Sequence, residues 1–133
     1  YTRVNAEFVD FVVDGEDFSG NKVPGVAPSR VDAVAALDRG PGFVELRGLW
    51  QDDVPVDDEG TASAESYFLV DARVGLRSVR TGRFSVEPFG AVANLFDASY
   101  VASVVPNAFG SRYFEPGLPR SFRLGVGVTW GPS

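Results

Sequence analysis

The sequence predicts an all-β fold, an antiparallel meander of about six long strands that forms part of a transmembrane β-barrel. Apolar and polar residues alternate in several segments, whereas helical periodicity is weak throughout. The connections between these segments run long, short, long, short, long. Outer-membrane barrels alternate long extracellular loops with short periplasmic turns in this way. Alternation by itself also fits a soluble sheet, so the loop pattern is what favours the barrel.

Six segments carry the alternation. They are, in order, Thr2–Val13, Arg30–Asp38, Phe43–Gln51, Tyr67–Arg77, Phe84–Leu95 and Arg120–Trp130. The fourth and sixth are the clearest, because their apolar residues keep a strict period of two. In a barrel this apolar set faces lipid and the polar set faces the lumen. We expect the lipid-facing set to be Val31, Ala33, Leu46, Val70, Ala72, Val74, Leu76, Phe89, Ala91, Leu124, Val126 and Val128. We expect the lumen-facing set to be Asp32, Glu45, Arg47, Asp71, Arg73, Arg123 and Thr129.

The long connections are polar, which suits the exterior of a cell. They cover Asp14–Ser29, Asp52–Ser66 and Phe96–Pro119, whereas Arg39–Gly42 and Ser78–Arg83 are short. The first two contain clusters of carboxylates, which are calcium ligands. Their spacing does not match an EF-hand, so we interpret them as solvated loops.

The composition excludes several classes of site. The chain has no Cys, His or Met and a net charge of −6. It therefore lacks disulfides, thiol nucleophiles and most transition-metal sites, and an acidic balance argues against nucleic-acid binding. We expect no enzyme activity, no cofactor and no catalytic or metal-binding residues, and the sequence assigns no ligand-binding residue. The chain begins with Tyr1 inside a predicted strand, so we expect a processed product or a fragment.

The last forty or so residues carry a more specific signal. Asn94-Leu95-Phe96-Asp97 and Tyr100 are followed by Gly110-Ser111-Arg112-Tyr113-Phe114-Glu115-Pro116-Gly117 and then Pro119-Arg120. This series resembles the C-terminal end of a TonB-dependent outer-membrane receptor. Two earlier segments, Gly20–Val26 and Tyr67–Gly75, are similar to the same family.

The resemblance implies that residues 1–133 are the C-terminal part of a receptor barrel, with the plug domain and earlier strands absent. It implies a place in the bacterial outer membrane and uptake of a scarce nutrient, such as an iron–siderophore complex or cobalamin. The implied partners are outer-membrane lipid, the receptor's own plug, the TonB complex, the barrel-assembly machinery and a small nutrient ligand. The alternative is a small outer-membrane barrel with a structural or adhesive role, although known single-chain barrels have at least eight strands.

Most motif residues have a structural interpretation. We expect Asn94 to bond backbone where its strand ends and Asp97 to cap the turn. Tyr100, Tyr113 and Phe114 fit an aromatic girdle at a membrane interface. Gly125 and Gly127 would clear the lumen face for an internal plug.

Overall fold

The computed structural model describes residues 1–131, without the side chains of Thr81 and Ser111, so the last two residues of the predicted domain lie outside the description. The fold is all-β, as predicted. The long strands are β4 (Ser29–Arg39), β5 (Gly42–Gln51), β8 (Tyr67–Leu76), β10 (Phe84–Ala93) and β13 (Ser121–Trp130). The short strands are β1 (Thr2–Arg3), β2 (Val12–Val13), β3 (Glu16–Asp17), β6 (Val54–Pro55), β7 (Ser63–Ala64), β9 (Val79–Thr81), β11 (Val101–Val104) and β12 (Phe114–Pro116). A single 3-10 turn, η1, covers Phe109–Ser111.

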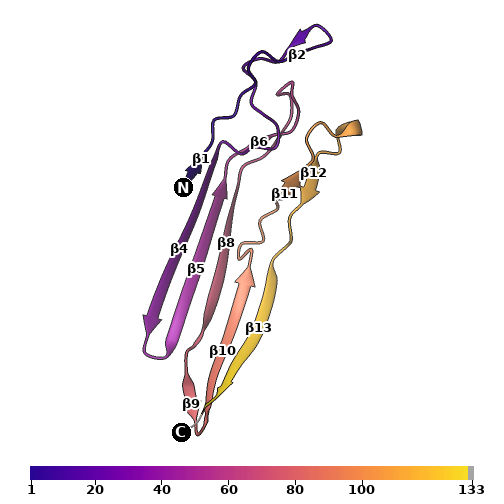
Figure 1. Ribbon diagram of the computed structural model, residues 1–133. Coiled ribbons are helices and arrows are strands. Elements are labelled where there is room, and N and C mark those ends of the chain that lie inside the picture. Colours follow the sequence, from indigo (N-terminus) through magenta and orange to yellow (C-terminus); the bar gives the residue numbers. More distant parts are fainter. Residues whose placement is uncertain (132–133) are drawn as a thin grey trace. The chain divides into compact units, whose positions relative to one another are not determined.

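The main sheet is a meander in sequence order. Its strands follow the path β1-β4-β5-β8-β10-β13, and β9 also pairs with β10 (Figure 1). This confirms the predicted topology. β1 and β13 stand at the two ends of the path, and no pairing between them is present in the described part of the chain. Gly40 and Gly82 lie in the two short turns with φ of 58° and 61°, a left-handed conformation that glycine adopts without a steric penalty.

The chain divides into two compact units. The first, which we call the loop unit, contains Tyr1–Asp32, Leu49–Phe68 and Ser99–Leu118. The second, the sheet unit, contains Ala33–Gly48, Leu69–Ala98 and the segment from Pro119 onward. The long connections lie mainly in the loop unit, and most residues of the five long strands lie in the sheet unit.

The predicted first strand, Thr2–Val13, is wrong. Its two ends form β1 and β2, which pairs with β3 in a separate hairpin, and between them Glu7 makes an isolated bridge to Lys22. Asp10 has a φ of 53°, which breaks an extended run, and the rings of Phe8 and Phe11 stack at 4.5 Å. Backbone groups of this segment bond to its own loop, for example Val23 N–H to Ala6 C=O. The segment therefore folds on itself.

The acidic loop Asp52–Glu59 is not simply solvated, which corrects the expectation from its charge. Val54 and Asp57 are buried, and Val56 has 0% of its surface exposed. The chain turns back here, since β6 pairs with β7 and Val56 N–H donates to Ala62 C=O. The two valines between the acids and Ala64 form the small core of the loop unit.

Asp57 stabilises this turn through its side chain. Its carboxylate accepts hydrogen bonds from the Thr61 backbone at 2.8 Å, from the Thr61 hydroxyl and from the Ala62 backbone. Burial by itself raises the pKa of Asp57, but these hydrogen bonds outweigh it and the net pKa is lowered. The folded loop therefore stabilises the charged form of Asp57.

Candidate functional site

The sheet unit has one apolar and one polar face, and the register of β10 with β13 defines them. Residues directly opposite each other in an antiparallel pair lie on the same face. Leu124 pairs with Gly90 and Val126 with Pro88, whereas Arg123 pairs with Ala91. On these two strands the apolar face comprises Phe84, Val86, Pro88, Gly90, Val92, Phe122, Leu124, Val126, Val128 and Trp130. The polar face comprises Ser85, Glu87, Phe89, Ala91, Ala93, Ser121, Arg123, Gly125, Gly127 and Thr129.

The apolar face is uncovered. Leu124 is 88% exposed and Val126 is 60% exposed. Among the residues expected to face lipid, Ala33, Leu46, Val74, Leu76, Leu124, Val126 and Val128 are exposed, while Val31, Val70 and Ala72 are partly exposed. Soluble monomers rarely leave a continuous apolar surface of this kind open to water.

No helix among the described residues is long and apolar enough to cross a membrane.

The predicted orientation of Phe89 and Ala91 is wrong. Phe89 pairs with Gly75 and Gly125, and Ala91 pairs with Arg73 and Arg123, so both lie on the polar face. The two residues looked lipid-facing because they are apolar. Glu87 has the same parity as both, and it is the signal in the sequence that could have corrected the assignment.

A hollow of about 400 Å³ lies on the polar face of the sheet unit. Four neighbouring strands contribute to its lining: β5, β8, β10 and β13. The charged residues that line it are Glu45, Arg47, Asp71, Arg73 and Arg123, all from the predicted lumen-facing set. The structure therefore brings five of the seven predicted polar-face residues together at one place.

Arg73 is held beside this hollow by two aromatic rings. Its guanidinium carbon lies 4.5 Å from the centre of the Phe89 ring and 5.3 Å from that of Phe43. The rings lie where two glycines leave space. A Cβ at Gly125 would come within 2.5 Å of the Phe89 ring, and one at Gly75 within 2.8 Å of the Phe43 ring. The expected role of Gly125, making room for a plug, is thus replaced by a contact within the sheet.

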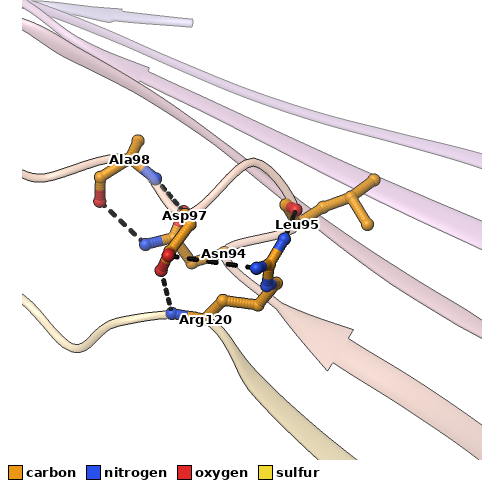
Figure 2. A network of polar contacts seen from close by, with 5 residues as sticks. All are labelled: Asn94, Leu95, Asp97, Ala98 and Arg120. Atoms are coloured by element: carbon orange, nitrogen blue, oxygen red, sulfur yellow. Dashed lines mark hydrogen bonds and ion pairs between the residues drawn. The ribbon is translucent and has the colours of Figure 1, made fainter.

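The Asn-Leu-Phe-Asp motif forms a polar network, which we call the Asn94 clasp (Figure 2). Asn94 is 5% exposed and has a φ of 52°, which ends β10. Its side chain accepts a hydrogen bond from Ala98 N–H at 2.9 Å and donates to Ala98 C=O at 2.8 Å. Its backbone N–H donates to the Asp71 carboxylate at 2.9 Å. The predicted role of Asn94 is confirmed, and the Tyr67–Gly75 motif meets this one through Asp71.

Asp97 connects the clasp to the last strand instead of capping its own turn. Its carboxylate accepts the backbone N–H of Arg120 at 2.8 Å (Figure 2). The ladder between β10 and β13 ends at the pair Ala93 and Ser121, one residue before Arg120. The Asp97 carboxylate thus continues the pairing beyond the end of the ladder.

The motif aromatics lie in the loop unit. The ring of Tyr100 is 4.9 Å from that of Tyr67 and lies over Gly117, where a Cβ would clash with it. Tyr113 and Phe114 contact each other edge to face at 5.9 Å. Their placement in an interfacial girdle stays a prediction.

No group of three or more acidic residues that could hold a metal ion is found among the described residues. The acids of the polar face lie beside arginines, so this face offers charged hydrogen-bonding groups and aromatic rings to a ligand.

Comparison with known proteins gives a partial match. Over 63 residues, 47% of the chain, the sequence is 44% identical to the catecholate siderophore receptor Fiu of Escherichia coli strain K12. The same values hold for Fiu of strain UTI89 and of Escherichia coli O157:H7. The match spans 7% of the length of these receptors. No protein-family model matches the chain. The partial homology supports a receptor-like origin.

Proposed function

We propose that residues 1–133 form the C-terminal barrel portion of a TonB-dependent outer-membrane receptor, whose plug domain and earlier strands lie outside this chain. The receptor takes up a scarce nutrient, such as an iron–siderophore complex or cobalamin. The observation that carries the proposal is the uncovered apolar face of β10 and β13 opposite a face lined with arginines and carboxylates. A barrel wall needs one such face for lipid and the other for a wet lumen.

The partial similarity to a catecholate siderophore receptor supports the same assignment. The motifs that carry the family resemblance also have a structural role. The side chains of Asn94 and Asp97 order the turn after β10, and Asp97 accepts the backbone N–H of Arg120, just before β13. Catalysis by these residues is not needed. In the proposed mechanism the loops capture the nutrient, and the TonB complex drives displacement of the plug.

The proposed wall has several partners. Outer-membrane lipid covers the apolar face, the plug and the nutrient lie on the lumen side, and the barrel-assembly machinery inserts the strands. The end strands β1 and β13 would pair with strands outside this chain, because unpaired strand edges are aggregation-prone.

The test uses the full-length protein that contains this chain, expressed in a Gram-negative host without catecholate receptors of its own. We expect it in the outer-membrane fraction, and we expect radiolabelled iron in a catecholate complex, or labelled cobalamin, to accumulate only when TonB is intact. Recovery outside the outer membrane, or uptake that is equal with and without TonB, would contradict the proposal.

A further inference from the structure

We propose that Arg73 and Arg123 form a binding site for the oxyanion of a small ligand, a carboxylate or phosphate group, over Ala91 on the polar face. The proposal goes beyond uptake as such, because it assigns a ligand chemistry to two named residues. It rests on their register, on the rings that position Arg73 and on the free donors of both side chains.

The register places the two arginines on either side of one small residue. Ala91 pairs directly with Arg73 on β8 and with Arg123 on β13, so all three share a face. Neighbouring strands are about 4.8 Å apart, which puts the two arginine backbones roughly 10 Å apart. Two long side chains can converge on one group across this span, and the methyl group of Ala91 leaves the space between them open.

Arg73 is pre-organised for such a contact. Phe89 and Phe43 flank its guanidinium at 4.5 and 5.3 Å, and Gly125 and Gly75 make room for these rings. A guanidinium that stacks on an aromatic ring keeps its N–H groups available for hydrogen bonds. Ordering the side chain in advance lowers the entropy cost of binding. Two glycines thus position two rings, and the rings position the arginine.

Neither arginine has a protein partner for its hydrogen-bond donors among the described residues. Within residues 1–131 neither Arg73 nor Arg123 makes a hydrogen bond or an ion pair, although both line the hollow. Two like charges across one alanine repel each other, and an anion between them would remove that repulsion. In the described part of the chain neither carboxylate of this hollow, Asp71 or Glu45, forms an ion pair with either arginine.

The ligand class follows from donor geometry and charge. A guanidinium presents two parallel N–H groups that match the two oxygens of a carboxylate or phosphate. Arginines outnumber carboxylates in the lining of this hollow, whereas the whole chain has a net charge of −6. A free anion that is repelled by the rest of the surface would therefore be attracted to the positive charge of these arginines. The volume of about 400 Å³ is in the usual range for a small-molecule site.

Binding can be measured by titration calorimetry on the purified full-length protein in detergent at low ionic strength, with citrate and inorganic phosphate as separate probes. We expect saturable binding of at least one probe. Arg73→Gln and Arg123→Gln should each weaken it about tenfold or more, because each removes a charge-assisted contact. Arg73→Lys and Arg123→Lys should restore part of the affinity, since they return the charge without the planar donor pair.

Arg77→Gln is the matched control. Arg77 also contacts the Phe43 ring, at 4.6 Å, but it is already paired with Asp38 at 2.9 Å. We expect it to leave binding unchanged. Gly125→Ala, which displaces the Phe89 ring, should weaken binding, whereas Gly127→Ala should not, because its new Cβ would meet nothing closer than 3.6 Å.

Three results would overturn the site. The first is no saturable binding of either probe. The second is unchanged affinity in both glutamine variants. The third is an equal loss of affinity in Arg77→Gln, which would indicate a general charge effect. Because binding is measured without transport, these results are independent of the uptake experiment.

Discussion

Val126 and Gly127 are neighbours with opposite environments, and an arginine at each position should have different effects. Val126 is 60% exposed on the apolar face and pairs with Pro88, whereas Gly127 pairs with Glu87 on the polar face. An arginine facing hydrocarbon near the bilayer centre costs about 2–4 kcal/mol. On the lumen side, water or Glu87 can solvate the charge. We expect Val126→Arg to lower the amount of folded receptor in outer membranes far more than Gly127→Arg.

Gly127→Arg is the internal control, since both variants add the same side chain to the same strand. Equal losses, or a greater loss at Gly127, would mean that the faces of β13 are assigned in reverse or that this strand does not meet lipid.

Asp57 should make the stability of the loop unit depend on pH. Its pKa is lowered from the ordinary value of 3.8, so its contribution is complete above that value. As the pH falls through the lowered pKa, the folded carboxylate is protonated and the contribution is lost. In denaturant unfolding, the stability difference between the wild type and Asp57→Asn should be largest above about pH 4 and shrink in more acidic solution. A difference that grows on acidification would contradict the assigned direction.

The Asn94 clasp connects two strands, because the Asp97 carboxylate, which follows β10, accepts the Arg120 backbone N–H, just before β13, at 2.8 Å. Asp97→Ala removes this acceptor, whereas Asp97→Asn keeps an oxygen in the same place. A hydrogen bond of this kind contributes about 0.5–1.5 kcal/mol. We expect the Arg120 amide to exchange its hydrogen faster in Asp97→Ala and near the wild-type rate in Asp97→Asn. Equal acceleration in both variants would indicate that the charge, and not the acceptor, matters.

Strand positions follow closely from the sequence where period-two alternation is strong. β4, β5, β8 and β13 lie within one or two residues of the predicted segments. β10 shows the limit of this reasoning. Both of its faces contain apolar residues, so apolar alternation leaves its orientation open. Glu87, which shares a face with Phe89 and Ala91, and the register with the neighbouring strands define that orientation.

The short hairpins of the loops are not predicted by alternation. β6–β7 and β11–β12 are too short for a periodic signal, and their pairing depends on contacts between distant loops. Asn107, for example, donates its side-chain amide to the Asp58 carboxylate at 3.0 Å, and its backbone N–H to Val56 C=O at 2.9 Å.

The candidate binding site was predictable only in part. Arg73 and Arg123 are assigned to the polar face by alternation alone. The positions of the two rings beside Arg73 are not predicted: alternation places Phe89 in the lipid-facing set because it is apolar, and Phe43 is assigned to neither face. The sequence shows Gly75 and Gly125 but not their role, which is to leave space for the rings of Phe43 and Phe89 that lie against them.

At the scale of the whole molecule, the exposed apolar side chains on one face of the sheet require an apolar environment. Buried side chains are few, and within residues 1–131 the buried apolar set is Phe43, Val54, Val56 and Ala64. The larger apolar side chains of β13 are exposed, including Phe122, Leu124 and Trp130. A water-soluble protein of this length would bury most such residues in a core. Lipid supplies the missing environment in our account.

The most direct test of this account is a spin-label scan along β13 in the full-length protein reconstituted in lipid bilayers. This chain has no cysteine, so each introduced cysteine gives one label in the segment. Labels at residues 124, 126 and 128 should collide mainly with oxygen, which partitions into lipid. Labels at residues 123, 127 and 129 should collide mainly with a water-soluble nickel complex. A period-two alternation with this phase is the predicted result, and equal access of the nickel complex to both sets would contradict a lipid-facing wall.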